Sequence, residues 1–224
     1  MKTETLDLNP PMSATTAHAA LPEGDNNSAA VLLIQEWWGV DDHIRDIASR
    51  YAGEGYICVA PDLYRGKVTH DGEEASKLMH ALAIEDGIAT IRSAFEETKR
   101  KYNVSRIGIT GYCMGGTFAL RAACDMPELD ASATFYGDIP DEETLSHLKV
   151  PTLFIAGERD QWINPEKVEG LKEAARKYNL PVEVVSYDAD HAFFNDTRPE
   201  VHNADAAQDA WRRVLEFFDS RLRR

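Results

Sequence analysis

Residues 106–124 read RIGITGYCMGGTFALRAAC, and this stretch decides the fold. Residues 106–110, with Ile107 and Ile109, predict a strand, and the mostly small and apolar residues 115–124 predict a helix. Between them, GYCMGG at 111–116 matches the turn pattern G-x-S-x-G, with Cys113 in the serine position. This pattern marks a sharp turn between a strand and a helix. We therefore expect Cys113 at the carboxyl end of a strand and the N-terminal end of a helix.

Outside this stretch, short apolar segments alternate with helical patterns. Strands are predicted at 30–34, 56–60, 131–136, 152–156 and 182–187. Helices are predicted around 44–51, from Pro165 onward and around 207–218, and a short polar helix is predicted between 136 and 152. A longer helix is predicted over 73–101, with a break near Asp86 and Gly87. Apolar strands that alternate with amphipathic helices indicate a parallel sheet covered on both faces. The sequence therefore predicts an α/β fold with a mostly parallel central sheet and helices on both faces.

The 224 residues are expected to form one domain, 1–224, because no linker-like segment divides them. Residues 1–28 hold short β-like pieces beside turn-rich segments, and they are predicted to form N-terminal edge strands or a hairpin. Hydrophobic residues make up 43% and charged residues 28%, as in globular proteins. We expect a monomer, since one sheet accounts for the apolar stripes of the helices.

The chain carries 24 Lys and Arg against 38 Asp and Glu, a net charge of −14. Such a surface repels phosphate groups, so neither nucleic acid nor an anionic membrane is expected as a partner. No apolar run reaches the roughly 18 residues of a membrane span. Three cysteines without CxxC spacing predict neither a disulfide framework nor a zinc site, and Cys58 and Cys124 are interpreted as small hydrophobic residues. With no secretory signal among the first residues, we expect a cytoplasmic protein.

The residues around Cys113 suit a cysteine nucleophile. Glycine is needed at 111 and 115 because side chains there would collide with neighbouring elements. The helix that follows directs its N–H groups and its positive dipole end toward developing negative charge, and it favours thiolate over thiol. The predicted oxyanion donors are the backbone N–H groups of Met114 and of Trp37.

A nucleophile on such a turn needs an acid and then a histidine later in the chain. Asp160 follows the strand 152–156 and His191 follows the strand 182–187, at carboxyl ends where the loops of a parallel sheet converge. We predict that the thiol attacks an acyl carbon, that His191 moves the proton and that Asp160 orients the imidazole. Glu158, on the same loop as Asp160, is the alternative acid.

Four stretches together resemble the dienelactone hydrolase family, whose members are cysteine hydrolases of the α/β-hydrolase fold. They are QEWWGV at 35–40, APDLY at 60–64, GYCMGG at 111–116 and HAFF at 191–194. The resemblance implies the same three catalytic residues. It adds Glu36, which in the family meets the resting thiol and takes part in its activation as substrate binds. A carboxylate beside the thiol would disfavour a free thiolate and its oxidation.

The resemblance also indicates where the substrate pocket departs from the family. Dienelactone-cleaving members hold the substrate carboxylate with arginines, one of them four residues after the catalytic histidine, where this chain has Asn195. The second is expected before 77–79, but residues 71–74 read DGEE. The alternative cations are Arg198, Arg65 and Lys67, and the predicted pocket residues are Trp38, Tyr136 and Asn195. The chain is therefore expected to hydrolyse a small ester or lactone, with a specificity that is broader than, or different from, that of the dienelactone-cleaving members. The predicted hydrolysis implies no metal and no organic cofactor.

Two other functions would use the same turn. Acyl transfer or thioester cleavage uses the same triad, and the sequence does not separate it from ester hydrolysis because the acyl acceptor is not encoded in the turn. A non-catalytic, redox-sensing thiol would need Cys113 but would not require Asp160.

Overall fold

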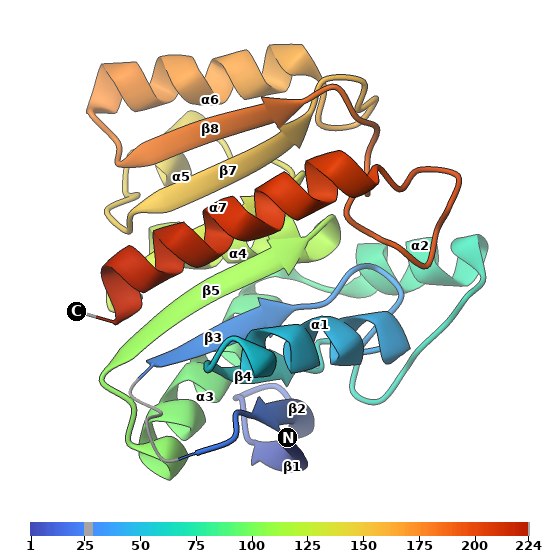
Figure 1. Ribbon diagram of the computed structural model, residues 1–224, viewed down its shortest axis with the longest axis vertical. Helices are drawn as coiled ribbons and strands as arrows, with labels where there is room; N and C mark the ends of the chain where they lie inside the picture. Colours follow the sequence, from blue (N-terminus) through green and yellow to red (C-terminus); the bar gives the residue numbers. More distant parts are fainter. Residues whose placement is uncertain (25–28, 224) are drawn as a thin grey trace. The chain divides into compact units, whose positions relative to one another are not determined.

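The computed structural model describes residues 1–24 and 29–223. The chain divides into two compact units, Met1–Ile109 and Thr110–Arg224. Figure 1 shows the elements of each unit. The single domain over 1–224 stays a prediction, and residues 25–28, which belong to the predicted N-terminal edge region, lie outside the described residues.

The first unit is an α/β layer with strand order β1-β2-β4-β3. Its strands are β1 (Lys2–Leu8), β2 (Thr15–Leu21), β3 (Ala29–Ile34) and β4 (Ile57–Pro61). β2 pairs antiparallel with β1 and β4, and β3 pairs parallel with β4. Its helices are α1 (Asp42–Gly53), α2 (Gly72–Ala81) and α3 (Ile84–Tyr102). Figure 1 shows α1 and α3 on opposite faces of these strands.

The helix predicted over 73–101 is interrupted, but the predicted position of the break is wrong. α2 ends at Ala81, and α3 begins at Ile84 after two residues in extended conformation. Asp86 lies in the first turn of α3, where a negative side chain is favoured by the helix dipole. Gly87 is buried, and its N–H donates to the Ala83 carbonyl oxygen at 3.1 Å. The Asp-Gly pair therefore belongs to the start of a helix and does not interrupt one.

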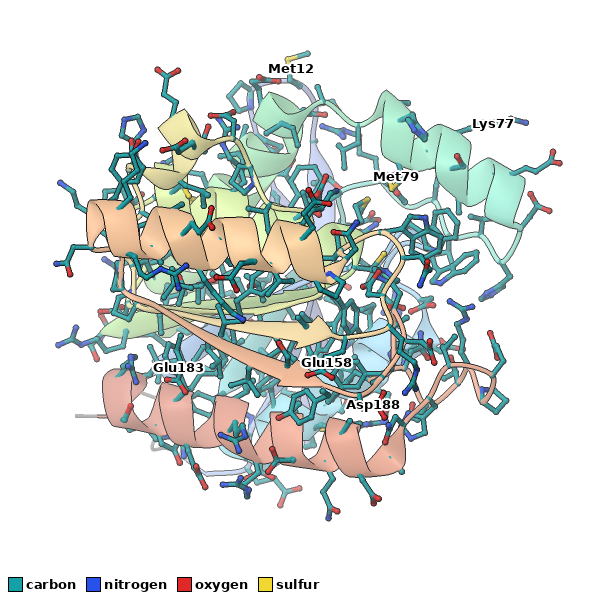
Figure 2. All side chains as sticks on the ribbon, turned by 90° about the horizontal axis from the view of Figure 1, so that it is seen from above. Met12, Lys77, Met79, Glu158, Glu183 and Asp188 are labelled. Atoms are coloured by element: carbon teal, nitrogen blue, oxygen red, sulfur yellow. The ribbon has the colours of Figure 1, made fainter. Side chains whose placement is uncertain are left out.

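The boundary between the units falls within β5 (Arg106–Tyr112), and the strands from there on have the order β5-β6-β7-β8. Its other strands are β6 (Ala131–Phe135), β7 (Thr152–Gly157) and β8 (Val182–Tyr187). β7 pairs parallel with both β6 and β8. The helices are α4 (Met114–Asp125), α5 (Glu142–Leu145), α6 (Pro165–Tyr178) and α7 (Ala204–Leu222). Figure 2 shows α7 on one face of β7 and β8 and α6 on the other.

The predicted α/β class with mostly parallel strands is confirmed. β3 with β4, β6 with β7 and β7 with β8 run parallel, and the described antiparallel pairs involve β2. β3 and β7 are buried along their whole length, as expected for strands covered on both faces. β8, last in the order, is partly exposed. In the described part of the chain, every helix is too short or too polar to span a bilayer.

Candidate active site

Cys113 stands between β5 and α4 in a backbone conformation that few L-residues adopt. Its φ of 55° and ψ of −120° belong to the N-terminal cap residue of α4. Such a conformation costs about 1–3 kcal/mol and persists where the surrounding structure enforces it. The Cys113 N–H donates to the Phe135 carbonyl oxygen at 3.1 Å, and the Cys113 carbonyl oxygen accepts the Thr117 N–H at 3.1 Å. This is the sharp turn from strand to helix that the sequence predicts.

Glycines allow the turn to be this tight. A Cβ atom on Gly111 would lie 2.1 Å from the Gly115 carbonyl oxygen, so a side chain is excluded there, as predicted. A Cβ atom on Gly116 would lie 2.4 Å from the Phe135 carbonyl oxygen, and one on Gly137 would lie 2.1 Å from the Gly116 carbonyl carbon. α4 therefore approaches the turn after β6 through two glycines, and the sequence alone does not predict this contact.

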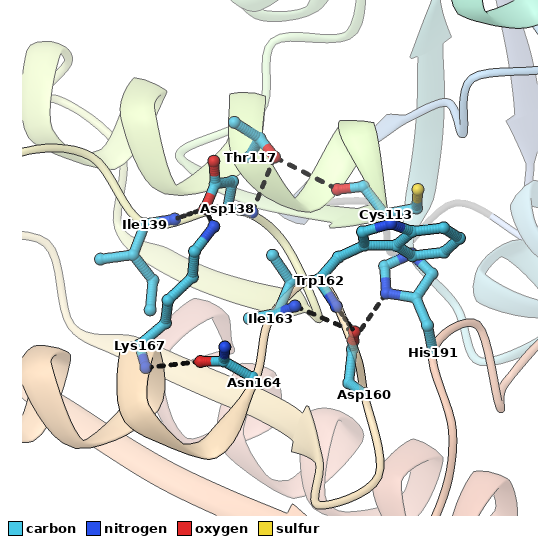
Figure 3. A network of polar contacts seen from close by, with 10 residues as sticks. All are labelled: Cys113, Thr117, Asp138, Ile139, Asp160, Trp162, Ile163, Asn164, Lys167 and His191. Atoms are coloured by element: carbon cyan, nitrogen blue, oxygen red, sulfur yellow. Dashed lines mark hydrogen bonds and ion pairs between the residues drawn. The ribbon is translucent and has the colours of Figure 1, made fainter.

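Asp160 lies in the loop after β7, with its side chain fully buried and both oxygens hydrogen-bonded. Oδ2 lies 2.6 Å from Nδ1 of His191. Oδ1 accepts the backbone N–H groups of Trp162 and Ile163 at 2.8 and 2.9 Å. Because a carboxylate only accepts, Nδ1 of His191 carries the proton in this pair. Figure 3 shows the acid and the histidine together with Cys113.

The surroundings of Asp160 keep its carboxyl group ionised. Burial alone would raise the pKa of Asp160, but the hydrogen bond and charge of His191 and the N–H groups of Ile163 and Trp162 outweigh it and lower the pKa below its ordinary value. The carboxylate therefore contributes stability that is fully present above the ordinary pKa and is lost as the pH falls through the lowered one. At neutral pH the ionised carboxylate therefore accepts the Nδ1–H of His191.

His191 follows β8 and lies close to two aromatic side chains. Its ring centroid is 5.0 Å from that of Tyr136 and 4.8 Å from that of Trp162, which meets it edge to face at 89°. Among the residues described, none gives the buried Nε2 of His191 a hydrogen-bond partner. With the Nδ1 proton directed at Asp160, Nε2 is the ring atom able to accept a proton.

Several contacts fix the loop of the acid against the loop of the histidine. Gly157 ends β7, and a Cβ atom there would lie 2.5 Å from the Ala189 carbonyl oxygen. The backbone N–H of Arg159 donates to that same oxygen at 3.1 Å. The Arg159 guanidinium forms ion pairs with Asp188 and, at 3.2 Å, with Asp190. The two loops are thereby held together by one arginine and a close backbone approach.

The alternative acid and the other cysteines lie in different surroundings. Glu158 is exposed, and Figure 2 shows it at the end of β7. Burial raises the pKa of the Cys58 thiol, and burial together with the Asp125 charge raises that of Cys124 to about 12. Neither thiol ionises at neutral pH, which agrees with their interpretation as small hydrophobic residues. Cys113, by contrast, is partly exposed.

Two predicted pocket residues belong to this unit and have different surroundings. Tyr136 follows β6 with a φ of 38°, is almost fully buried, and packs against the His191 ring. Asn195 is also buried, and its Oδ1 accepts the backbone N–H and the hydroxyl of Thr197 at 3.0 and 2.6 Å. Tyr136 therefore adjoins the acid–histidine pair, whereas the described contacts of Asn195 close a turn.

The three alternative cations differ in their partners. The Nε of Arg198 pairs with Glu200 at 2.8 Å in the second unit. In the first unit, Arg65 pairs with Asp86 at 2.7 Å, and Lys67 is exposed. Two of the three are therefore already engaged with carboxylates of the chain.

The other predicted site residues belong to the first unit. Glu36, Trp37 and Trp38 follow β3, and Glu36 is buried. The two indoles meet edge to face with centroids 4.9 Å apart. Gly39, with a φ of 100°, closes this turn by donating its N–H to the Glu36 carbonyl oxygen at 3.3 Å. The catalytic and oxyanion roles of these residues stay predictions.

A groove of about 550 Å³ lies apart from the acid–histidine pair, along α5 and α6. Lys167 pairs with Asp138 at 2.7 Å, and Lys177 pairs with Glu142, so both lysines that line the groove are paired with carboxylates of its own wall. The Asp138 N–H donates to Thr117 Oγ1 at 2.8 Å, which connects this groove to α4 (Figure 3). None of the predicted site residues lines it. Across residues 1–24 and 29–223, no three His, Cys, Asp or Glu side chains gather as metal ligands would.

Comparisons with known proteins agree on one family. A model described as the dienelactone hydrolase family matches residues 15–222. The chain is 34% identical over 204 residues to protein Usf of Aquifex pyrophilus, which covers 86% of this chain and 88% of that protein. It is 33% identical over 218 residues to a candidate carboxymethylenebutenolidase of Escherichia coli K12, over 90% of this chain and 80% of that protein.

A solved structure gives the same result. The crystal structure of a candidate dienelactone hydrolase from Klebsiella pneumoniae is 29% identical in sequence and has a TM-score of 0.90. The match covers 97% of this chain and 98% of that one. The likeness therefore extends over both units of the chain.

Proposed function

Because the chain belongs to the dienelactone hydrolase family and is a carboxylic ester or lactone hydrolase, we propose that Cys113, His191 and Asp160 form its catalytic triad. The observation that supports this best is the 2.6 Å contact between Asp160 and His191, which leaves the buried Nε2 as the proton acceptor. The strained turn at Cys113, in the same unit, supports the thiol as nucleophile.

In the first half of the proposed reaction, the ester becomes an acyl-cysteine. The Cys113 Sγ forms a bond to the acyl carbon while its proton passes to Nε2 of His191. Asp160 stabilises the imidazolium that results. The carbon–oxygen bond to the alcohol then breaks, and the leaving oxygen takes the proton from Nε2. The thioester that remains is the acyl-cysteine intermediate.

In the second half, water releases the acid. A water molecule gives a proton to Nε2 as its oxygen attacks the thioester carbon, and the carbon–sulfur bond breaks. The sulfur takes the proton back, which restores the resting thiol. For a lactone, the alcohol and the acid are two ends of one product.

The charge that develops on the carbonyl oxygen needs hydrogen-bond donors. Met114 is the first residue of α4, so its backbone N–H lies at the positive end of the helix dipole. We assign it as one donor. The second donor, the backbone N–H of Trp37, remains a prediction from the sequence.

The substrate that we propose is a small neutral ester or lactone. A carboxylate is held tightly by a bidentate arginine, and Asn195 stands where the resemblance calls for one. Arg198, three residues further on, pairs with Glu200. The second unit thus supplies no evident replacement among the described residues 189–203.

Two matched substrates and a thiol reagent test the proposed function. We expect the reduced enzyme to hydrolyse a neutral short-chain aryl ester faster than a dienelactone that bears a free carboxylate. Alkylation of Cys113 with iodoacetamide should abolish both activities. If reduced protein turned over no ester, lactone or thioester, the redox-sensor hypothesis would replace hydrolysis by this triad.

Glu36 provides a separate prediction about the resting thiol. If its carboxylate restrains ionisation of the thiol, Glu36→Gln should lower the pKa of Cys113, speed inactivation by peroxide and reduce turnover. The measurement is the pH profile of alkylation by iodoacetamide. Glu73→Gln, at an exposed position in α2, is the matched control. An alkylation profile unchanged from the wild type would remove Glu36 from the mechanism.

A further inference from the structure

Trp162 is a large apolar side chain that remains exposed beside His191. It is 64% exposed, although its indole meets the imidazole edge to face with ring centroids 4.8 Å apart. Single exposed apolar residues are ordinary on protein surfaces. This one is unusual because it adjoins the group that moves the proton (Figure 3), whose ring also lies 5.0 Å from that of the buried Tyr136.

The backbone that carries the indole is anchored at several points. The N–H groups of Trp162 and Ile163 both donate to Oδ1 of Asp160, and Ile163 is buried. Asn164 then caps α6 by accepting the Lys167 N–H at 3.0 Å. A ligand that packs on this indole therefore meets a surface that is already ordered, which reduces the entropy cost of binding.

The proposed mechanism decides which part of the substrate reaches this surface. The leaving alcohol oxygen takes its proton from Nε2 of His191, so the group attached to that oxygen lies beside the imidazole. Trp162 adjoins the same ring. We propose that Trp162 binds a neutral aromatic group on the alcohol side of the ester, an inference that rests on the proposed function.

The chemistry of the surroundings favours a neutral aromatic ring. Two aromatic rings attract each other in offset or edge-to-face contact, whereas the face of an indole carries partial negative charge and disfavours a carboxylate. Asp188 and Asp190 precede His191 and share the single cation Arg159. The described charges on these two loops are thus net negative, which further disfavours an anionic alcohol.

Two esters distinguish the alcohol side from the acyl side. Phenyl acetate carries its ring on the alcohol, and methyl benzoate carries it on the acyl group. Relative to wild type, Trp162→Ala should lower kcat/KM for phenyl acetate about tenfold more than for methyl benzoate. Trp162→Phe should retain most of the activity. Tyr178→Ala, at an exposed aromatic position at the end of α6, should leave kcat/KM unchanged for both esters.

A binding measurement separates this inference from the triad. Phenoxyacetone shares the phenoxy group of phenyl acetate but is a ketone without an ester bond, so its binding is measured without hydrolysis. By NMR titration we expect Trp162→Ala to bind it about tenfold more weakly than the wild type, and Trp162→Phe to bind it nearly as well. Unchanged binding by Trp162→Ala, or equal losses on the two esters, would overturn the assignment. Activity retained by Cys113→Ala would refute the triad and leave this binding result intact.

Discussion

Cys113→Ala should lower kcat for ester hydrolysis by roughly 10⁴-fold or more, with little change in substrate affinity. Alanine removes the sulfur that forms the acyl bond but keeps the backbone of the turn, whose φ of 55° is enforced by glycine contacts on both sides. The measurement is steady-state turnover of a neutral aryl ester, together with the melting temperature. A fall in kcat at an unchanged melting temperature is the expected result.

The matched control for this variant is Cys124→Ala. Cys124 lies near the C-terminal end of α4, the helix that begins at the turn. It is buried, and burial raises the pKa of its thiol to about 12. Its removal should cost some stability, because it leaves a small cavity, but should not reduce kcat more than about twofold. Equal losses in the two variants would mean that Cys113 acts only through folding.

Asp160→Asn should reduce kcat by about 10³–10⁴-fold, a loss larger than steric change alone explains. Two backbone N–H groups point at Oδ1, so the amide oxygen takes that position and the amide nitrogen faces Nδ1 of His191. The amide then donates to Nδ1, which moves the ring proton to Nε2. An imidazole protonated at Nε2 cannot take the proton of the thiol.

Glu158→Gln is the control for the acid, because Glu158 is exposed on the same loop. We expect its kcat to stay within about twofold of wild type. The pH profile gives a second comparison. Since the pKa of Asp160 is below its ordinary value, wild-type kcat should not fall from protonation of this acid until well below neutral pH. A large loss in Glu158→Gln with near-normal activity in Asp160→Asn would exchange the roles of the two carboxylates.

Much of this arrangement is predictable from the sequence because its signals are local. The apolar strands and the turn at 111–116 fix where Cys113 stands, and the glycine at 111 is explained by one close contact with Gly115. The order of elements places Asp160 and His191 after successive strands, β7 and β8, which pair in parallel. Proximity of their loops follows from that pairing.

Other features depend on contacts between distant residues, and no local pattern predicts them. In the sequence Arg159 is an ordinary charged loop residue, yet in the structure it pairs with two carboxylates about thirty residues away. Exposed ion pairs of this kind contribute little to the free energy of folding. The exposure of Trp162 is likewise a property of the folded unit. The break before α3 lies earlier in the chain than the sequence predicts, because Gly87 is buried within the helix and this burial outweighs its poor helix propensity.

The central claim is that hydrolysis passes through an acyl group on Cys113, and rapid acid quench with mass spectrometry tests it most directly. Trypsin releases residues 107–121 as one peptide, in which Cys113 is the single cysteine. During the burst phase with an aryl ester, we predict that this peptide gains the mass of the acyl group and loses it as turnover ends. A burst of alcohol release with the peptide 107–121 unmodified, or with the acyl group on another peptide, would contradict the account.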